Sequence, residues 1–258
     1  MRVVAALALL ASFAQARPLP DADSFYRETR ANLERSQREQ FRFAYKERRT
    51  ELHTNPFGRL GSGETVAYEV TPDEGGAVVL RRLIERGGQP VTSSKVERIE
   101  FKRGQERRDR PRRSVWEDTV QTLRMTMDRR ETYGGRAAIV VLFEPRPEAQ
   151  PQTREGRLAK VFKGSIWVDE LSREVVRVEA MAMDDISIGM GLVARLNEGS
   201  TVSLTRERVD DSTWLLTSLR FAGEGRALLF RKLTVNHVIE WFDYRKVLTP
   251  ALQAPARD

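Results

Sequence analysis

The sequence predicts a mainly β protein, in which a curved antiparallel sheet of up-and-down strands carries flanking helices. Short segments with period-two alternation of apolar and polar residues recur between residues 137 and 245. Turn residues, such as Asp210-Asp211-Ser212 and Gly223-Glu224-Gly225, separate successive segments. The hydrophobic share of 40% is enough for a sizeable core, and the chain has no cysteine to support it with disulfides.

The first 16 residues form a signal peptide by their pattern. Met1-Arg2 is a positive n-region, Val3 to Phe13 is an apolar h-region, and Ala14-Gln15-Ala16 is a cleavage signal. The apolar run is about half of the roughly 20 residues that a membrane-spanning helix needs. We therefore expect cleavage after Ala16, a mature chain that begins at Arg17, and a periplasmic location.

The rest of the chain is expected to form one domain over residues 17–248, followed by a C-terminal tail, residues 249–258. Without cysteine, the chain can hold neither a lipobox nor a thiol nucleophile nor a Cys-ligated zinc site. The net charge of +7 favours anionic partners, which outside the cytoplasm are lipid headgroups rather than nucleic acid. Alternatively, the charge serves only solubility.

The first predicted element is a surface helix, for which Asp21, Asp23 or Ser24 is available as N-cap. Its thin apolar stripe faces a sheet and consists of Phe25, Thr29, Leu33 and Ser36. A strand is expected from residue 41 to 52, with Phe41, Phe43 and Tyr45 on one side. Residues 64–70 and 77–84 follow as a hairpin.

Two less regular segments come next. Residues 90–113 form a charged insert, either a helix or a mobile excursion, whose basic run reads as a solvated face or as a contact for anionic lipid. No stacking aromatics are interleaved with it, which argues against nucleic acid. Residues 114–130 are predicted to be a helix that is either a lid over a cavity, hinged at Gly134-Gly135, or a helix packed on the sheet. Its apolar face holds Trp116, Val120, Leu123 and Met127.

Strands are then expected at 137–144, 164–169, 174–183, 201–209, 213–221, 227–235 and 237–245. Alternation assigns the apolar side chains to one inner side of the curved sheet and charged side chains such as Arg177, Glu179 and Arg220 to the other. The inner residues that we expect to line a ligand cavity are Ile166, Val168, Val176, Val178, Ala180, Val202, Leu204, Leu219 and Phe221.

The chain shows no grouping of acid, base and nucleophile. His53 and His237 are the only histidines, and neither has a second ligand at metal-binding spacing. Neither a phosphate-binding glycine loop nor a G-x-S-x-G motif occurs. We therefore expect no catalytic residue, no metal and no cofactor, and the protein is not expected to be an enzyme.

Several motifs resemble a known family: Phe143-Glu144-Pro145-Arg146-Pro147, Phe162 to Asp169, Glu174 to Glu179, Trp214-Leu215 and Phe242 to Arg245. They look like the outer-membrane lipoprotein-sorting-like family, which is similar to the periplasmic lipoprotein carrier LolA and to RseB. The likeness covers chiefly residues 132–247 and is weaker from 41 to 90. It implies an incomplete, half-open β-barrel of about eleven strands, covered by helices around an apolar cavity that shelters lipid chains.

Together these lines predict a periplasmic lipid- or lipoprotein-binding protein, a carrier of acyl chains towards the outer membrane. Each methylene hidden from water contributes roughly 0.8 kcal/mol, so an apolar cavity can retain a chain. Two alternatives remain open at this stage. One is an RseB-like sensor that binds a membrane-anchored partner protein, and the other is a non-catalytic structural protein.

Overall fold

The computed structural model describes residues 17–54, 60–72, 78–92, 96–100, 115–188, 194–227 and 231–247. The expected signal peptide, the C-terminal tail and residues 93–95 and 101–113 of the charged insert lie outside the described residues. The predictions made for them therefore stay predictions.

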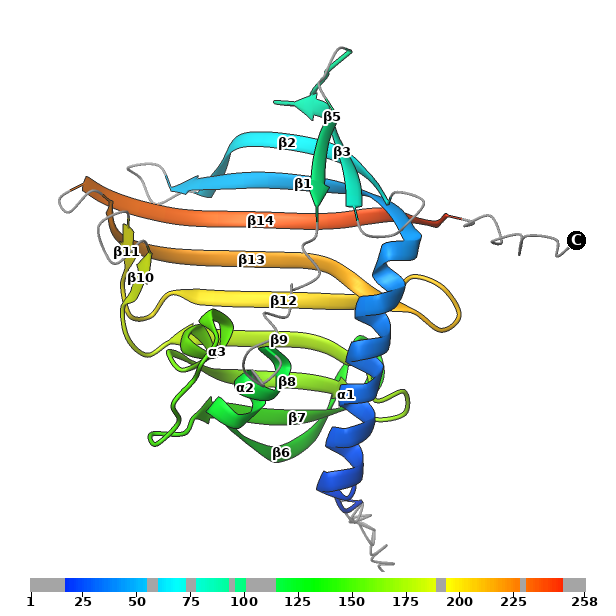
Figure 1. Ribbon diagram of the computed structural model, residues 1–258, viewed down its shortest axis with the longest axis vertical. Coiled ribbons are helices and arrows are strands. Elements are labelled where there is room, and N and C mark those ends of the chain that lie inside the picture. The colour runs from blue at the N-terminus through cyan, green and yellow to red at the C-terminus, as the bar shows by residue number, and fades with distance from the viewer. Residues whose placement is uncertain are drawn as a thin grey trace, which may run out of the picture.

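The strands of the described residues join in one antiparallel sheet, whose main path runs β4-β3-β2-β1-β14-β13-β12-β9-β8-β7-β6 (Figure 1). No ladder joins β4 to β6 within the described residues, so the sheet is curved but not closed. This confirms the predicted mainly β class and the up-and-down order. The strands are β1 (Phe43–Thr54), β2 (Leu60–Pro72), β3 (Val78–Arg86), β4 (Gln89–Pro90), β5 (Val96–Glu100), β6 (Leu123–Tyr133), β7 (Arg136–Pro145), β8 (Phe162–Asp169), β9 (Val175–Ala182), β10 (Ile186–Ile188), β11 (Ala194–Leu196), β12 (Thr201–Arg208), β13 (Trp214–Ala227) and β14 (Arg231–Lys246).

Four helical elements accompany the sheet: α1 (Ala22–Glu39), the 3-10 turn η1 (Gln40–Arg42), α2 (Val115–Thr122) and α3 (Arg154–Ala159). Figure 1 shows α1 crossing in front of the strands at one end, with α2 and α3 in front of the middle of the sheet. We call the face covered by α1 and α2 the inner face, and the opposite one the outer face.

Strand register fixes which side chains share the inner face. Ile166, Val178, Leu204 and Leu219 lie directly opposite one another across β8, β9, β12 and β13. Ala180, Val202 and Phe221 form the next row in the same way. Because the side-chain period of a strand is two, both rows point to one face.

Helix α1 begins at an N-cap, Asp21, whose carboxylate accepts a hydrogen bond of 2.9 Å from the backbone N–H of Ser24. Its buried residues are Phe25, Thr29 and Ser36, while Leu33 is half-buried, so the predicted stripe is confirmed. Phe25 is the anchor of the helix because it packs against a group of buried side chains on the sheet. That group is Ile139, Val141, Val168 and Val175.

Polar contacts hold α1 at the turn between β8 and β9. The side-chain amide of Asn32 donates to the carbonyl oxygens of Ser172 and Arg173, at 2.8 and 3.2 Å. The guanidinium of Arg35 lies 3.0 Å from the carboxylate of Glu174. These contacts span about half of the sequence and fix the helix across the strand ends.

The far end of the inner face, at β1 and β14, is closed by aromatic and charged side chains. The buried carboxylate of Glu47 accepts hydrogen bonds from Arg49 at 2.6 Å and from the indole N–H of Trp241 at 3.1 Å. Tyr45 packs beside it against Val70. Burial, reinforced by the charge of Glu47, raises the pKa of Tyr45 to about 12.

The predicted helix over residues 114–130 is half wrong, because α2 ends at Thr122 and the chain continues as β6. The spacing of Leu123 and Met127 fits one helix face, but with Met125 it also fits the period of a strand. Pairing with β7 decides between the two, since it supplies a partner for the backbone from Leu123 to Tyr133. Gly134 and Gly135, with φ of 56° and 77°, form the tight turn of this hairpin and are not a hinge.

Three further strand predictions are corrected. Gly223-Glu224-Gly225 is not a turn but lies inside β13, where a Cβ on Gly223 would collide with the Ser200 side chain. Two strands were expected at 227–235 and 237–245, but the described residues of this region form one strand, β14. Phe41 belongs to η1 and not to β1.

The charged insert also departs from the prediction. Its residues Val96–Glu100 form β5, which pairs with β3, instead of a helix or a mobile segment. Pro90 ends the short strand β4.

Candidate functional site

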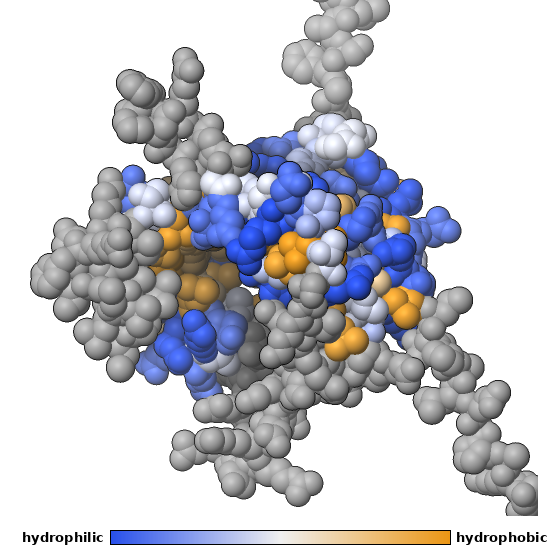
Figure 2. All heavy atoms as spheres, turned by 90° about the horizontal axis from the view of Figure 1, so that it is seen from above, coloured by the Kyte–Doolittle hydropathy of each residue, from blue (hydrophilic) through white to orange (hydrophobic). Residues whose placement is uncertain are grey.

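An apolar cavity of about 340 Å³ lies on the inner face, between α1, α2 and the sheet. In Figure 2, hydrophobic side chains lie at the floor of a hollow that hydrophilic side chains border. The helices contribute the roof and the strands contribute the floor. The lining residues are Leu33, Ser36, Gln37 and Gln40 from the α1 end, Thr119 and Val120 from α2, and Leu123, Met125, Phe143, Ile166, Val175, Val178, Leu204, Arg206, Trp214, Leu215 and Leu216 from the sheet and its edge.

The cavity exists because α1 fills only part of the space above the sheet. Under its first turns, Phe25 occupies the gap completely. Two to three turns later, the residues that face the sheet are Leu33, Ser36 and Gln37, and these leave an opening next to α2. A short serine in the roof thus keeps volume that a larger apolar residue would fill.

Three of the nine expected cavity residues line this space: Ile166, Val178 and Leu204. Five others share the inner face without lining it. Val168 is buried in the core beneath Phe25, whereas Leu219 continues the row of Leu204 across β13. Ala180, Val202 and Phe221 form the row next to it, and Val202, Leu219 and Phe221 are half-buried.

Val176 is wrong as a cavity residue, because it lies on the outer face. It packs there with Ala138, Val140 and Trp167. The pairing of β8 with β9 shifts between Trp167, which lies opposite Arg177, and Val168, which lies opposite Val175. This bulge places Val175, and not Val176, on the inner face. A bulge inserts one extra residue and so reverses the simple alternation from which the sequence prediction was made.

The four residues predicted to form a lid are separated by the structure. Val120, from α2, and Leu123, from the start of β6, both border the cavity. Met127 packs below α1 in the core and is not part of the cavity lining. Trp116 lies on α2, but its side chain is outside the described residues.

Helix α2 is fixed to its neighbourhood by a buried carboxylate. Asp118 accepts hydrogen bonds from the backbone N–H groups of Gln152 and Thr153, at 3.0 and 2.7 Å, and from the Thr153 hydroxyl at 2.7 Å. A Cβ on Gly156 would collide with the same carboxylate, so α3 approaches α2 closely at this point. Any movement of α2 must therefore carry α3 with it or break these bonds.

Sequence reasoning missed an ion network at the wall of the cavity. Arg206 is only 6% exposed, and its guanidinium lies 3.1 Å from the carboxylate of Glu174, which is 1% exposed. Arg206 also donates to the carbonyl oxygens of Val175 and Trp214, at 2.9 and 2.7 Å. Burial lowers the pKa of Arg206 from its ordinary value, and the charge of Glu174 opposes this effect. Strand alternation could have placed Arg206 on the inner face, because it lies two residues after Leu204 in the same strand.

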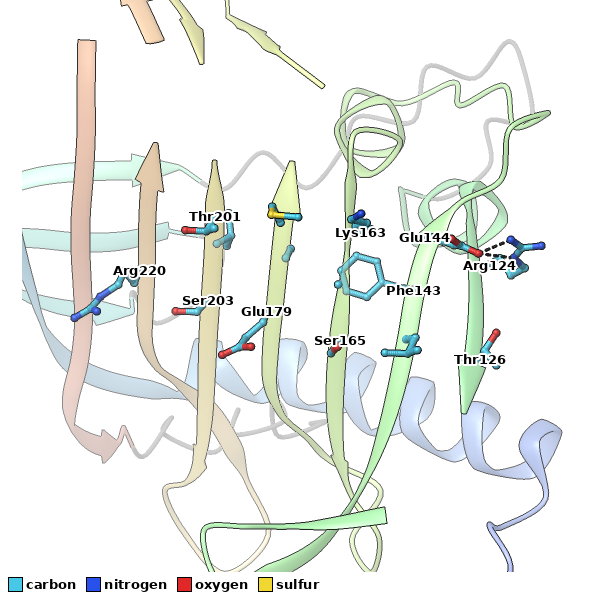
Figure 3. A pocket seen from close by; sticks show the side chains of 15 residues that line it. Arg124, Thr126, Phe143, Glu144, Lys163, Ser165, Glu179, Thr201, Ser203 and Arg220 are labelled. Carbon is cyan, nitrogen blue, oxygen red and sulfur yellow. Dashed lines mark hydrogen bonds and ion pairs between the residues drawn. The ribbon is translucent and has the colours of Figure 1, made fainter. Parts of the chain in front are cut away.

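The outer face carries a larger but open groove of about 740 Å³ (Figure 3). Two rows of side chains border it: one contains Ser165, Glu179, Ser203 and Arg220, and in the other Arg124 pairs with Glu144. Figure 3 shows α1 behind the sheet that carries these side chains. Most of its lining residues carry a hydroxyl group or a charge, but Leu142 and Met181 are exposed among them and most of its accessible surface is apolar.

Within the described residues, no group of three or more His, Cys, Asp or Glu side chains could hold a metal ion. Nδ1 of His237 lies 4.0 Å from a carboxylate oxygen of Glu51, both on exposed side chains, and the side chain of His53 is outside the described residues. None of the described helices is long and apolar enough to cross a membrane.

No protein-family model matches the chain, and no curated protein sequence matches it. Solved structures do resemble it. A domain from Vibrio parahaemolyticus described as outer membrane lipoprotein-sorting is 12% identical, over 86% of this chain and 93% of that one, with a TM-score of 0.38. A LolA superfamily protein from Nitrosomonas europaea is 12% identical, over 85% and 93%, with a TM-score of 0.34.

The MucA/MucB complex of Pseudomonas aeruginosa also matches, at 11% identity over 86% of this chain and 99% of that one, with a TM-score of 0.27. The first two structures carry the names of the group that the sequence motifs resemble. A fold does not by itself determine a function.

Proposed function

We propose that the chain is an exported binding protein that shelters an acyl chain in the inner-face cavity. The observation that carries the proposal is the cavity itself, an apolar space of about 340 Å³ between α1, α2 and the sheet. Its volume falls within the range of small-molecule sites. Its floor consists mostly of aliphatic and aromatic side chains, which offer an acyl chain dispersion contacts.

The inner face beyond the cavity supports the same function. Leu219, Phe221 and Ile239 continue the apolar surface across β13 and β14 and are only half-buried. Each methylene that leaves water for such a surface contributes roughly 0.8 kcal/mol, so a chain that extends from the cavity along these rows gains with its length. Transport of acyl chains towards the outer membrane is one use of such a protein.

Export rests on the signal-peptide pattern of the first 16 residues. The expected mature chain is tied to the sheet from its start, because Arg130 donates hydrogen bonds to the carbonyl oxygens of Arg17 and Pro18, at 2.6 and 3.0 Å. N-terminal sequencing of protein from the periplasmic fraction should find Arg17 first. A product that retains Met1 on the membrane would contradict export by this signal.

A second candidate function is that of a sensor that binds a membrane-anchored partner protein. The outer groove favours it, since Leu142 and Met181 are 39% and 42% exposed among its charged and hydroxyl side chains. Apolar residues within a polar rim are typical of protein interfaces. Both functions are compatible, because the two sites lie on opposite faces of the same strands.

Mass spectrometry of organic extracts tests the proposal. Protein purified from the periplasm without detergent should release one class of acyl lipid in near-stoichiometric amount, and the delipidated protein should bind a fluorescent fatty acid. Lipid-free protein that also fails to bind the probe would contradict the proposed function. Capture of a membrane-anchored protein by such lipid-free protein would favour the sensor.

A further inference from the structure

One end of the cavity is polar, and one N–H group of the guanidinium there has no partner among the described residues. Arg206 uses Nη1 and Nη2 for its hydrogen bonds to Glu174, Val175 and Trp214, and its Nε–H has no acceptor among the described residues. Arg206 is one of the residues that line the cavity, so a ligand there can approach its guanidinium. A guanidinium edge of this kind binds carboxylate and phosphate oxygens well.

The roof adds further hydrogen-bonding groups next to this guanidinium. Ser36, Gln37 and Gln40 line the cavity, and no hydrogen bond of their side chains is recorded within the described residues. Arg35, which precedes Ser36, contacts Glu174, the partner of Arg206, so this end of α1 and the guanidinium are tied to the same carboxylate. The lining therefore combines an apolar floor with hydrogen-bond donors in the roof that have no partner among the described residues.

The charged side chain that reaches this end of the cavity is a cation, Arg206. Arg35, Glu174 and Arg206 form a connected triad of two cations and one anion. Among the described residues that line the cavity, Arg206 is the only charged one, and its partner Glu174 lies outside this lining. On the other side of the triad lies a second hollow, where Arg136 pairs with Asp169. Its remaining charged residues are Arg35, Glu39, Glu174, Arg208 and Asp211.

We propose that the ligand is an amphiphile with an anionic oxygen head group, a carboxylate or a phosphate, which accepts a hydrogen bond from the Nε–H of Arg206. Ser36, Gln37 and Gln40 donate further hydrogen bonds to the head group, while the chain lies along Ile166, Val178 and Leu204. The inference rests on the proposed function, because it assigns the head-group end of the same cavity. It excludes uncharged and cationic lipids as preferred ligands.

A head-group series on the unchanged protein tests this inference without disturbing the triad. Dodecanoate, dodecyl phosphate, dodecanol and dodecyltrimethylammonium share one chain and are measured, below their aggregation limits, by displacement of a fluorescent fatty acid. We expect the anions to bind about tenfold more tightly than dodecanol and the ammonium compound to bind least. The ratio of the two anions identifies carboxylate or phosphate as the better head group.

A variant sharpens the test. Gln40→Glu places a negative charge beside the proposed head-group site, and it should weaken dodecanoate about tenfold while leaving dodecanol unchanged. Gln121→Glu, on the exposed side of α2, is the matched control and should alter neither ligand. Equal affinities for anion, alcohol and ammonium would overturn this inference and leave the proposed function intact. Failure of all four compounds to bind would instead contradict the proposed function.

Discussion

The two faces of the same strands differ in what covers them. On β8, β9 and β12, the inner residues Ile166, Val178 and Leu204 border the apolar cavity, while their chain neighbours Ser165, Glu179 and Ser203 border the outer groove. Alternation alone produces this division. The helices add to this division, because α1 and α2 cover part of the inner face, whereas the described residues that line the outer groove all come from strands (Figures 1 and 3).

The outer face is not uniformly polar, which limits what alternation can explain. Val140, Trp167 and Val176 form a small core there, against which Tyr133 and Trp214 pack. The guanidinium of Arg177 lies 5.7 Å from the ring centroids of both Tyr133 and Trp167. Aromatic and cationic side chains thus cover one apolar patch on this face, whereas the inner apolar rows are left for a ligand.

The largest expected effect separates the two faces directly. Leu204→Arg places an unpaired charge in the apolar cavity and should cost about 4 kcal/mol of unfolding free energy or abolish binding of a fluorescent fatty acid. Ser203→Arg, on the adjacent outer residue, should change stability by less than about 0.5 kcal/mol and leave binding intact. Urea denaturation and probe titration provide both readouts. Equal behaviour of the two variants would mean that the face assignment is wrong.

The next effect concerns the roof of the cavity. Asp118→Ala leaves two backbone N–H groups and one hydroxyl without their buried acceptor, and should cost about 3 kcal/mol if α2 and α3 are a fixed part of the fold. In hydrogen-exchange measurements, the backbone amides of α2 should exchange only when the whole domain unfolds. If α2 exchanges freely before the substitution and ligand slows that exchange, α2 is a movable lid.

A smaller effect compares the floor with the roof. Leu123→Ala should cost about 2 kcal/mol, at the low end for a buried leucine because the side chain already borders a cavity. Val120→Ala, from the half-buried roof, should cost less than about 1 kcal/mol and mainly change the rate of ligand exchange. Thermal melts and stopped-flow probe release measure the two quantities. If Val120→Ala lowered the unfolding free energy more than Leu123→Ala, the assignment of Leu123 to the core and of Val120 to the roof would be wrong.

The smallest effect comes from a carboxylate at the end of β8. Burial opposes ionisation of Asp169, but hydrogen bonds from Arg136 and from the N–H and hydroxyl of Ser172 outweigh it and lower the pKa to about 2. A pKa that is lower in the folded state stabilises the protein above the unfolded value of about 3.9. This contribution is lost as the pH falls through about 2.

Because Arg136 is half-exposed, the contribution of the pair is about 1 kcal/mol. The wild type should lose this amount relative to Asp169→Asn between about pH 5 and pH 2, as measured by urea denaturation at each pH. Parallel pH profiles of the two proteins would contradict the assignment. The pair lies at the strand ends, so probe binding at neutral pH should not change.

The sequence predicted the features that depend on local pattern. The strand segments, the stripe on α1 and the inner rows of Ile166, Val178 and Leu204 all follow from periodicity. A single-residue bulge at Val175 and Val176 does not, because it depends on the pairing of β8 with β9. Residues 123–130 fit two periodicities, and only pairing with β7 decides between them.

The polar part of the candidate site could not be predicted for a different reason. Arg35, Glu174 and Arg206 meet over separations of 139 and 32 residues, and nothing in their local sequence marks them as partners. The opening between α1 and α2 depends likewise on which helix residues face which strands. Long-range packing therefore determines where the cavity is and how it is charged, although the apolar floor was visible in the sequence.

The most direct test of the central claim is photo-crosslinking with a diazirine-bearing fatty acid, followed by residue-level mass spectrometry. If the chain binds in the inner-face cavity, the adducts should fall on Leu33, Ile166, Val178 and Leu204, and excess dodecanoate should suppress them. The exposed apolar residues of the outer groove, Leu142 and Met181, serve as the internal comparison. Adducts concentrated on Leu142 and Met181, with none on the cavity residues, would contradict the account.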